Sequence, residues 1–233
     1  MINIRVFLIT ILIWCSAAIS FAAPYAAIVI DADTGKVLHF ENANTRLHPA
    51  GLTKLATLYA AFEAVETREV DLDAKARISL KAANEELAAL GMREGQRVSI
   101  RDLIRATAIK GANDTSTALA EAISGSEQAF TKRLDETAKE LGLSRSTFKN
   151  AHGLTEKGHL STANDMAFLM KAIADDFPNY LFVLGLIRHK AADKKITHSA
   201  RRLLKTYEGA VAAKTGYTRA TGFNGVLLAE RSN

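Results

Sequence analysis

Residues 51–65 read Gly-Leu-Thr-Lys-Leu-Ala-Thr-Leu-Tyr-Ala-Ala-Phe-Glu-Ala-Val, and this stretch decides the fold. From Leu52 to Val65, apolar side chains fall on nearly every face of a helix with this sequence. A helix that is apolar all round is buried inside a protein rather than lying on its surface. We therefore expect a central helix around which the other elements pack.

Strands are expected near both ends of the chain, with helices between them. An N-terminal hairpin is indicated by two apolar runs, 26–31 and 37–40, that flank a turn at 33–36. Two further strands are expected at 210–214 and 222–230, and helices at 101–109, 114–123, 127–141, 161–174 and 201–207. This order predicts an α+β fold, with an antiparallel sheet whose first and last strands come from opposite chain ends, beside an all-helical region. Ser161 or Thr162 is expected to cap the helix at 161–174, since Thr162 with Asp165 fits a capping box.

The composition excludes several classes of protein. The 233 residues are 48% apolar and 24% charged, which is typical of one globular domain with at most a small addition. A single cysteine, Cys15, excludes a disulfide framework. The net charge is only +5, and basic residues are interspersed with acidic ones along the chain. Nucleic acid is therefore not expected as a partner.

Residues 1–22 have the layout of a secretory signal peptide. Arg5 precedes an apolar run from Val6 to Trp14, and small residues stand at Ser20 and Ala22. This run is shorter than the roughly 20 apolar residues of a membrane span, although an uncleaved anchor is the alternative. We expect export across the inner membrane to the periplasm. Cleavage would leave residues 23–233 as a single domain with no integral membrane span.

Three short motifs are candidates for chemistry. Gly51–Lys54 opens the central helix, where a lysine must either extend to solvent or be held by partners in a cleft. Gly111–Asp114 precedes a helix, where Asn113 or Asp114 alone would suit an N-cap. Lys214–Gly216 ends a strand. In this order they match the S-x-x-K, S-D-N and K-T-G motifs of serine β-lactamases and penicillin-binding proteins, except that both serines are glycine.

Further characteristic stretches run from about Tyr25 to the last residue and include Ala27–Leu38, His48–Lys54, Thr147–Leu154, Lys214–Thr218 and Gly222–Asn224. With these stretches and the three motifs, the chain resembles the serine D-alanyl-D-alanine carboxypeptidases, the low-molecular-mass penicillin-binding proteins. The resemblance implies a β-lactamase-like fold and acyl transfer, in which a serine attacks the D-Ala-D-Ala carbonyl and water hydrolyses the acyl-enzyme. It implies no cofactor. The expected partners are peptidoglycan stem peptides, with β-lactams as non-covalent ligands.

The resemblance also implies roles for the two lysines and for Asn113. Lys54 would take the nucleophile's proton, which requires burial and nearby cations to lower its pKa. Asn113 would hold the peptide and relay protons. Lys214 would supply positive charge to the pocket and keep the pKa of Lys54 low.

The strand that carries Lys214 would bind the substrate through its backbone. Thr215 and Gly216 would pair with the peptide by β-augmentation. The backbone N–H groups of Gly51 and Tyr217 would form the oxyanion hole, since a glycine still offers its N–H.

The chain departs from the family where the chemistry needs hydroxyl groups. Gly51 has no nucleophile, Gly111 lacks the second serine, and Thr53 lies about 200° around the helix from position 51. The first hypothesis is a pseudoenzyme that has lost acylation and at most binds stem peptides. The alternatives are a functional carboxypeptidase, or a truncated, non-functional or scaffolding protein. Relative to the family, we expect the domain to be C-terminally incomplete by a strand and a closing helix.

The histidines and a basic cluster near residue 190 indicate no additional site. The six histidines show no paired ligand spacing, so no metal is expected. The basic cluster is expected to form a solvated loop rather than a contact for anionic lipid or wall polymer; it consists of Arg188, Lys190, Lys194 and Lys195.

Overall fold

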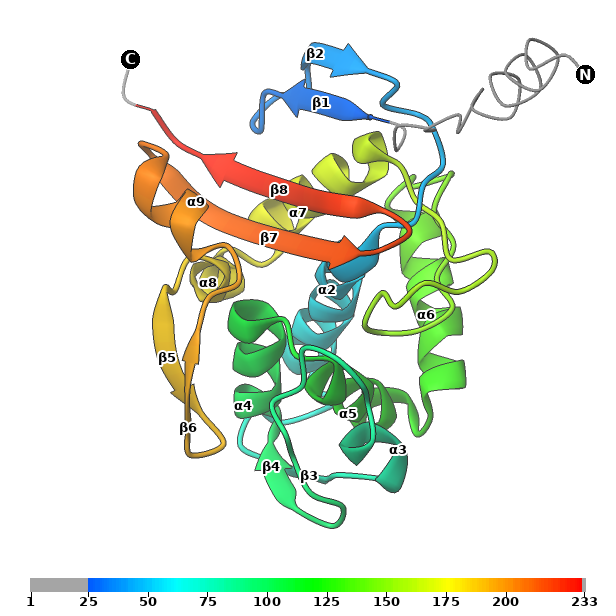
Figure 1. Ribbon diagram of the computed structural model, residues 1–233, viewed down its shortest axis with the longest axis vertical. Helices are drawn as coiled ribbons and strands as arrows, with labels where there is room; N and C mark the ends of the chain where they lie inside the picture. The colour runs from blue at the N-terminus through cyan, green and yellow to red at the C-terminus, as the bar shows by residue number, and fades with distance from the viewer. Residues whose placement is uncertain (1–24, 232–233) are drawn as a thin grey trace, which may run out of the picture.

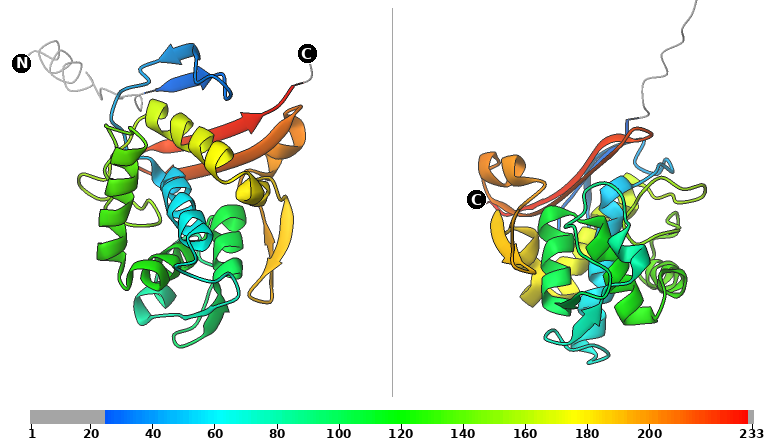
Figure 2. Two further views of the ribbon diagram at one scale, coloured as in Figure 1. Left: turned by 180° about the vertical axis from the view of Figure 1, so that it is seen from behind. Right: turned by 60° about the horizontal axis from the view of Figure 1, so that its bottom comes forward.

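The computed structural model describes residues 25–231 and confirms the α+β class (Figures 1 and 2). At its centre is α2 (Thr53–Glu66), which continues from the 3-10 turn η1 (Ala50–Leu52). Of the 14 residues in α2, 11 are buried, as its apolar sequence predicts. No helix within residues 25–231 is long and apolar enough to cross a membrane.

The other long helices surround α2. The helices α5 (Asn113–Ser124), α6 (Glu127–Glu140) and α7 (Ala163–Asp176) all pack against it. The predicted helix at 101–109 is α4 (Ile100–Arg105) followed by a π-helical turn, η2 (Ala106–Lys110). Shorter helices are α3 (Leu80–Ala83), α8 (Pro178–Leu181), η3 (Phe182–Leu184) and α9 (Arg201–Thr206).

Four antiparallel strand pairs complete the fold. They are β1 (Ala27–Ile30) with β2 (Val37–Glu41), β3 (Lys75–Arg77) with β4 (Arg97–Ser99), β5 (Arg188–Ala191) with β6 (Lys194–Thr197), and β7 (Ala210–Thr218) with β8 (Gly222–Ala229). The single sheet that we expected is divided, because β1 and β8 do not pair in the part of the chain that the structure describes. Both strands nevertheless pack on α7, so the first and last described strands lie on one side of the molecule (Figure 1).

The expectation of a solvated loop at residues 188–195 is wrong, because this segment forms the hairpin β5–β6. Its inward-facing residues include Ala191 and Ile196, which are buried. The exposed positions that alternate with these inward-facing residues hold Arg188, Lys190 and Lys195. So many charges in a short stretch obscure the alternation of apolar and polar residues that indicates a strand. The strands are stabilised because their few apolar residues pack in the core. Local sequence propensity does not indicate this tertiary contact.

The predicted N-terminus of α7 is confirmed at its cap. The Oγ1 of Thr162 accepts a hydrogen bond of 3.0 Å from the backbone N–H of Asp165. This contact satisfies one of the amide groups that a helix start leaves without an intrahelical partner.

We expect Phe62→Ala to lower the free energy of unfolding by about 3–5 kcal/mol, because Phe62 is fully buried and stacks on Tyr180 at 5.1 Å. Chemical denaturation measures this loss. The matched control is Phe223→Ala on β8, where the ring is 90% exposed and its removal is expected to change stability by less than about 0.5 kcal/mol. Equal losses in the two variants would contradict the central position of α2.

Candidate active site

The tertiary structure brings the three motifs together around Lys54. The side chain is 3% exposed, and its Nζ donates hydrogen bonds to Asn113 Oδ1 (2.8 Å) and to the backbone oxygen of His152 (2.6 Å). Lys54 is therefore held by partners inside the protein and does not extend to solvent. Its two acceptors come from the start of α5 and from the loop that follows α6.

The environment of Lys54 favours a neutral amine. Burial holds its pKa well below the usual value, and the charge of Lys214 lowers it further. The carboxylates of Glu85 and Asp114 act in the opposite direction but do not cancel the burial. A buried amine with a lowered pKa is the form that can accept a proton near neutral pH.

Lys214, on β7, is buried without a hydrogen-bond partner. Its side chain is fully buried, and among the described residues its Nζ makes no hydrogen bond. Burial lowers the pKa of Lys214 to about 8. The Nζ points at Gly111, because a Cβ built there would lie 3.0 Å from it. The ammonium group thus lies beside the position where the family motif carries a serine.

Both motif glycines suit the packing seen here. A Cβ on Gly51 would lie 2.9 Å from the backbone oxygen of Thr215 and 3.0 Å from the Cα of Gly216. Strand β7 therefore rests directly on the backbone of position 51. Gly111 has φ of +73°, a conformation that is costly for residues with a Cβ. A serine at either position would require the backbone to adjust.

The hydroxyl groups near the motifs are engaged in other contacts. Thr53 Oγ1 lies 2.8 Å from His159 Nε2, in the buried interior, so it does not replace the missing nucleophile. Thr215 Oγ1 donates to Ser199 Oγ at 3.2 Å. Ser199 Oγ is also 3.9 Å from the position of a Cβ on Gly111. No local sequence pattern marks Ser199, which lies near Gly111 only because of the fold.

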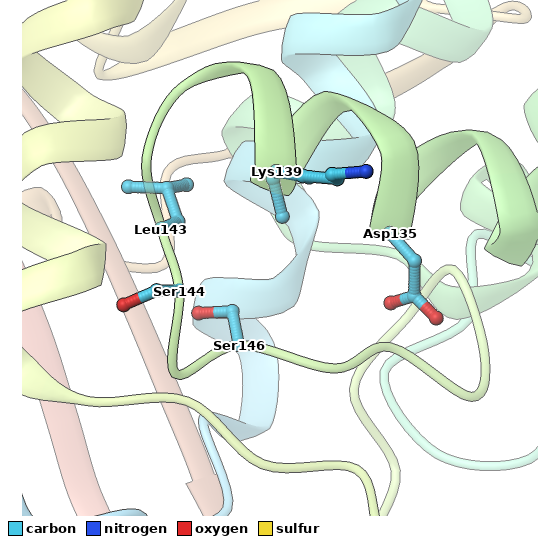
Figure 3. A pocket seen from close by; sticks show the side chains of 6 residues that line it. Asp135, Lys139, Leu143, Ser144 and Ser146 are labelled. Atoms are coloured by element: carbon cyan, nitrogen blue, oxygen red, sulfur yellow. The ribbon is translucent and has the colours of Figure 1, made fainter.

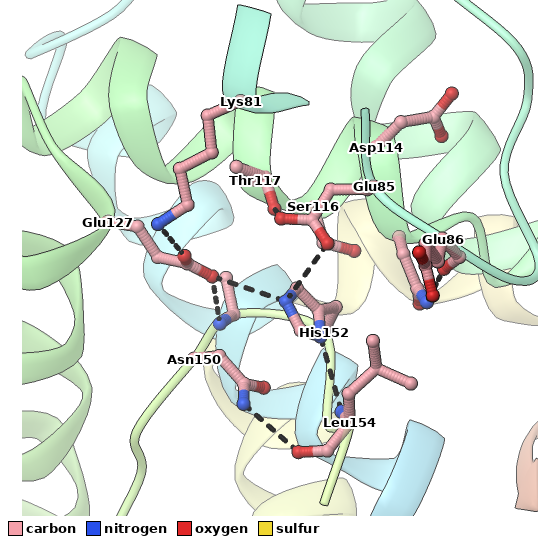
Figure 4. Close-up of polar contacts among 12 residues, drawn as sticks. Lys81, Glu85, Glu86, Asp114, Ser116, Thr117, Glu127, Asn150, His152 and Leu154 are labelled. Carbon is pink, nitrogen blue, oxygen red and sulfur yellow. Dashed lines mark hydrogen bonds and ion pairs between the residues drawn. The ribbon is translucent and has the colours of Figure 1, made fainter. Parts of the chain in front are cut away.

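A buried polar cluster supports the loop that holds Lys54 (Figure 4). The Nε2 of His152 lies 3.4 Å from a carboxylate oxygen of Glu85 and 3.6 Å from one of Glu127. Glu127 also accepts the backbone N–H of Ala151 at 2.8 Å and pairs with Lys81 at 2.6 Å. These contacts fix the backbone of residues 151 and 152, and therefore the carbonyl group that accepts the Lys54 hydrogen bond.

The hydrogen bonding of His152 favours a proton network over a metal site. Its Nδ1 accepts the backbone N–H of Leu154 at 3.2 Å, so the proton of the neutral ring is on Nε2. Burial lowers the pKa of His152 to about 4, which keeps the ring neutral near pH 7. Nε2 therefore offers a proton to the carboxylates of Glu85 and Glu127 and has no lone pair for a cation.

A cavity of about 260 Å³ lies apart from the motif residues, at the C-terminal end of α6 (Figure 3). Its lining includes Asp135 and Ser146. Asp135 accepts the N–H of Phe148, and the Ser146 hydroxyl donates to Asp165, so these polar groups already serve the fold.

The structure therefore brings the side chains of Lys54, Asn113 and Lys214 together, and the residue at position 51 has no side chain. The chain belongs to the D-alanyl-D-alanine carboxypeptidase family, whose family model matches residues 16–233. It is 36% identical over 211 residues to D-alanyl-D-alanine carboxypeptidase DacF of Bacillus subtilis. It is 34% identical over 219 residues to DacC of Escherichia coli. Each alignment covers 89% of this chain, and the chain spans about half of each relative, 54%.

Solved structures agree with the family assignment. Penicillin binding protein 5 of Haemophilus influenzae superposes with a TM-score of 0.85 and 26% identity, covering 91% of this chain and 63% of that one. Penicillin-Binding Protein D2 of Listeria monocytogenes, in its ampicillin-bound form, has a TM-score of 0.76 and 29% identity, covering 88% and 84%.

The buried Lys214 predicts an unusual pH dependence of stability. The pKa is about 8 in the folded protein and 10.5 in the unfolded chain, so the unfolded chain binds more protons between these values. Stability is therefore expected to rise with pH across this window. Lys214→Met should stabilise the protein at neutral pH by up to about 3 kcal/mol, with the gain vanishing above pH 10.5.

Denaturant unfolding at a series of pH values measures this effect. Lys132→Met, an exposed change on α6, serves as the control and should show no pH-dependent gain. A gain for Lys214→Met that stays constant from pH 7 to 11 would show that the buried charge does not limit stability.

Proposed function

We propose that this protein binds peptidoglycan stem peptides ending in D-Ala-D-Ala and is not acylated by them. The observation that carries the proposal is the glycine at position 51, where the family chemistry requires a hydroxyl group. Removing one member of a nucleophilic constellation commonly removes nearly all the activity that the constellation supplies. The nearest threonine on α2, Thr53, contacts His159 instead.

Several groups that would hold a peptide remain in place. Among the described strands, β7 pairs only with β8, and Thr215 and Gly216 on its other side pack closely on Gly51. We expect an extended peptide to pair with β7 once this contact loosens, with the positive charge of Lys214 on the same strand. Asn113 uses its amide oxygen to accept from Lys54 and its Nδ2 to donate to the backbone oxygen of Glu86 at 2.9 Å. These positions support the expectation of peptide binding without a covalent step.

The cellular setting follows from the chemistry of the ligand. Peptidoglycan lies outside the inner membrane, and the relatives act on D-alanyl-D-alanine ends by their names. We propose export directed by residues 1–22, which lie outside the described residues, and a periplasmic domain formed by residues 23–233.

A functional carboxypeptidase is the second candidate. The observation that favours it is Lys54, which retains the burial and lowered pKa of a general base. Activity would then require a nucleophile other than a residue-51 side chain. The candidates are Ser199, whose hydroxyl group lies 3.9 Å from a Cβ position on Gly111, and Thr215, which donates a hydrogen bond to that hydroxyl group.

The first test is labelling with a fluorescent penicillin. We expect no covalent band from the wild-type protein, because no hydroxyl group stands at position 51. The double variant Gly51→Ser, Gly111→Ser is expected to be labelled, provided that β7 moves away from position 51 to admit the serine Cβ.

Gly111→Ser alone is the control and should remain unlabelled. A covalent band on the wild-type protein would overturn the proposal and favour the functional enzyme. An unlabelled double variant that unfolds at the same temperature as the wild type would favour the scaffolding hypothesis.

The second test measures binding of a stem peptide by calorimetry. We expect a peptide ending in D-Ala-D-Ala to bind and the matching L-Ala-L-Ala peptide not to bind. Lys214→Met should weaken binding about 10–100-fold, since hydrogen bonds to charged groups contribute about 1.5–3 kcal/mol. Lys139→Met, on the exposed surface of α6, should leave the affinity unchanged. Equal binding of the two peptides would exclude recognition of the D-alanyl end.

A further inference from the structure

The net positive charge of the chain is concentrated in one segment. Residues 188–205 contain seven Lys and Arg residues and one Asp, a net charge of +6, whereas the whole chain carries +5. The remainder is therefore close to neutral. The segment forms β5, β6 and α9, which lie along one edge of the molecule (Figure 1).

The hairpin β5–β6 gathers like charges on its outer face. The strand register places Lys190 opposite Lys195 and Arg188 opposite Thr197, so these four side chains share one face. The other face is buried through Ile196 and Ala191. Like charges directly opposite each other destabilise a strand pair, so the outer face imposes a cost that the fold does not require.

In the part of the chain that the structure describes, Arg188 and Lys195 form no ion pair or side-chain hydrogen bond. Within the described residues, Lys190 pairs with Asp193 at 3.0 Å, with side chains 66% and 97% exposed. Such an exposed pair contributes little. Lys194 points away from the outer face and donates to the backbone oxygens of Leu90 and Gly91.

Helix α9 lies along the same edge of the molecule (Figure 1). It follows β6 after three intervening residues and carries Arg201, Arg202 and Lys205, all exposed. We call the exposed basic residues of the hairpin and the helix the basic edge: Arg188, Lys190, Lys195, Arg201, Arg202 and Lys205.

Exposed aromatic side chains flank the basic edge in the sequence. Phe182, in η3, is 56% exposed, and Tyr207, directly after α9, is 39% exposed. The guanidinium group of Arg231 lies 5.1 Å from the centre of the Tyr207 ring. Aromatic residues beside lysine and arginine are characteristic of proteins that rest at a bilayer surface, where the ring enters the interface and the cations meet the headgroups.

We propose that the basic edge binds the surface of an anionic phospholipid bilayer. Each lysine or arginine near such a surface contributes about 1 kcal/mol, and six act together here. The exposed aromatic residues favour a bilayer over a soluble polyanion, which offers no apolar layer for a ring. This peripheral contact goes beyond peptide binding and does not depend on it.

Vesicle sedimentation of the full chain tests the proposal. We expect binding to vesicles of phosphatidylcholine mixed with phosphatidylglycerol, decreasing as salt is added, because the attraction is screened within a Debye length. The variant Arg188→Gln, Lys190→Gln, Lys195→Gln should bind these vesicles about 100-fold more weakly, at about tenfold per 1.4 kcal/mol. Its unfolding temperature should be unchanged or higher, since the opposed lysines are gone.

The matched control is Lys132→Gln, Lys139→Gln, Lys157→Gln, which removes the same charge from exposed positions on α6 and the loop beyond it. All three proteins carry the same residues 1–24, so that segment contributes equally. The control should keep wild-type affinity. Equal weakening of both variants, or unchanged binding of the hairpin variant, would overturn the proposal. Retention on a soluble polyphosphate with no preference for anionic vesicles would also overturn it, in favour of a wall polymer.

Discussion

The structure depends on one buried amine. Lys54 lies almost fully buried in the first turn of the central helix, so its Nζ must find acceptors within the protein. It finds the Asn113 side chain and the His152 carbonyl group. These contacts join α2, α5 and the loop after α6. The cluster of Glu85, Glu127 and His152 supports this arrangement, because it fixes the backbone carbonyl group that accepts the Lys54 hydrogen bond.

The second buried lysine, Lys214, lies beside the position where a motif serine is replaced by glycine. Lys214 is fully buried and unpartnered at Nζ within the described chain, and it lies beside a residue with no side chain. A hydroxyl group there would give the ammonium group an acceptor. Strand β7 meanwhile rests on the backbone of Gly51. Backbone packing therefore closes position 51, while the side chains of Lys54 and Lys214 remain buried nearby.

The basic edge and the candidate site are connected through the chain. The segment His198–Ala200 joins β6 to α9, and its Ser199 hydroxyl accepts a hydrogen bond from Thr215 beside Gly111. Helix α9 also packs on β7. A bilayer contact at the basic edge would thus orient β7 relative to the membrane.

The sequence by itself determined the buried central helix, the two terminal strand pairs, the cap at Thr162 and the three motifs with their missing hydroxyl groups. These features follow from periodicity and residue identity, which are local. Only the tertiary structure decided that Lys54 is held internally, that Lys214 lacks a partner, that Ser199 and Glu127 belong near the site, and that residues 188–197 form strands. Each of these depends on which distant groups become neighbours, because hydrogen bonding and burial are set by contacts that no local pattern contains.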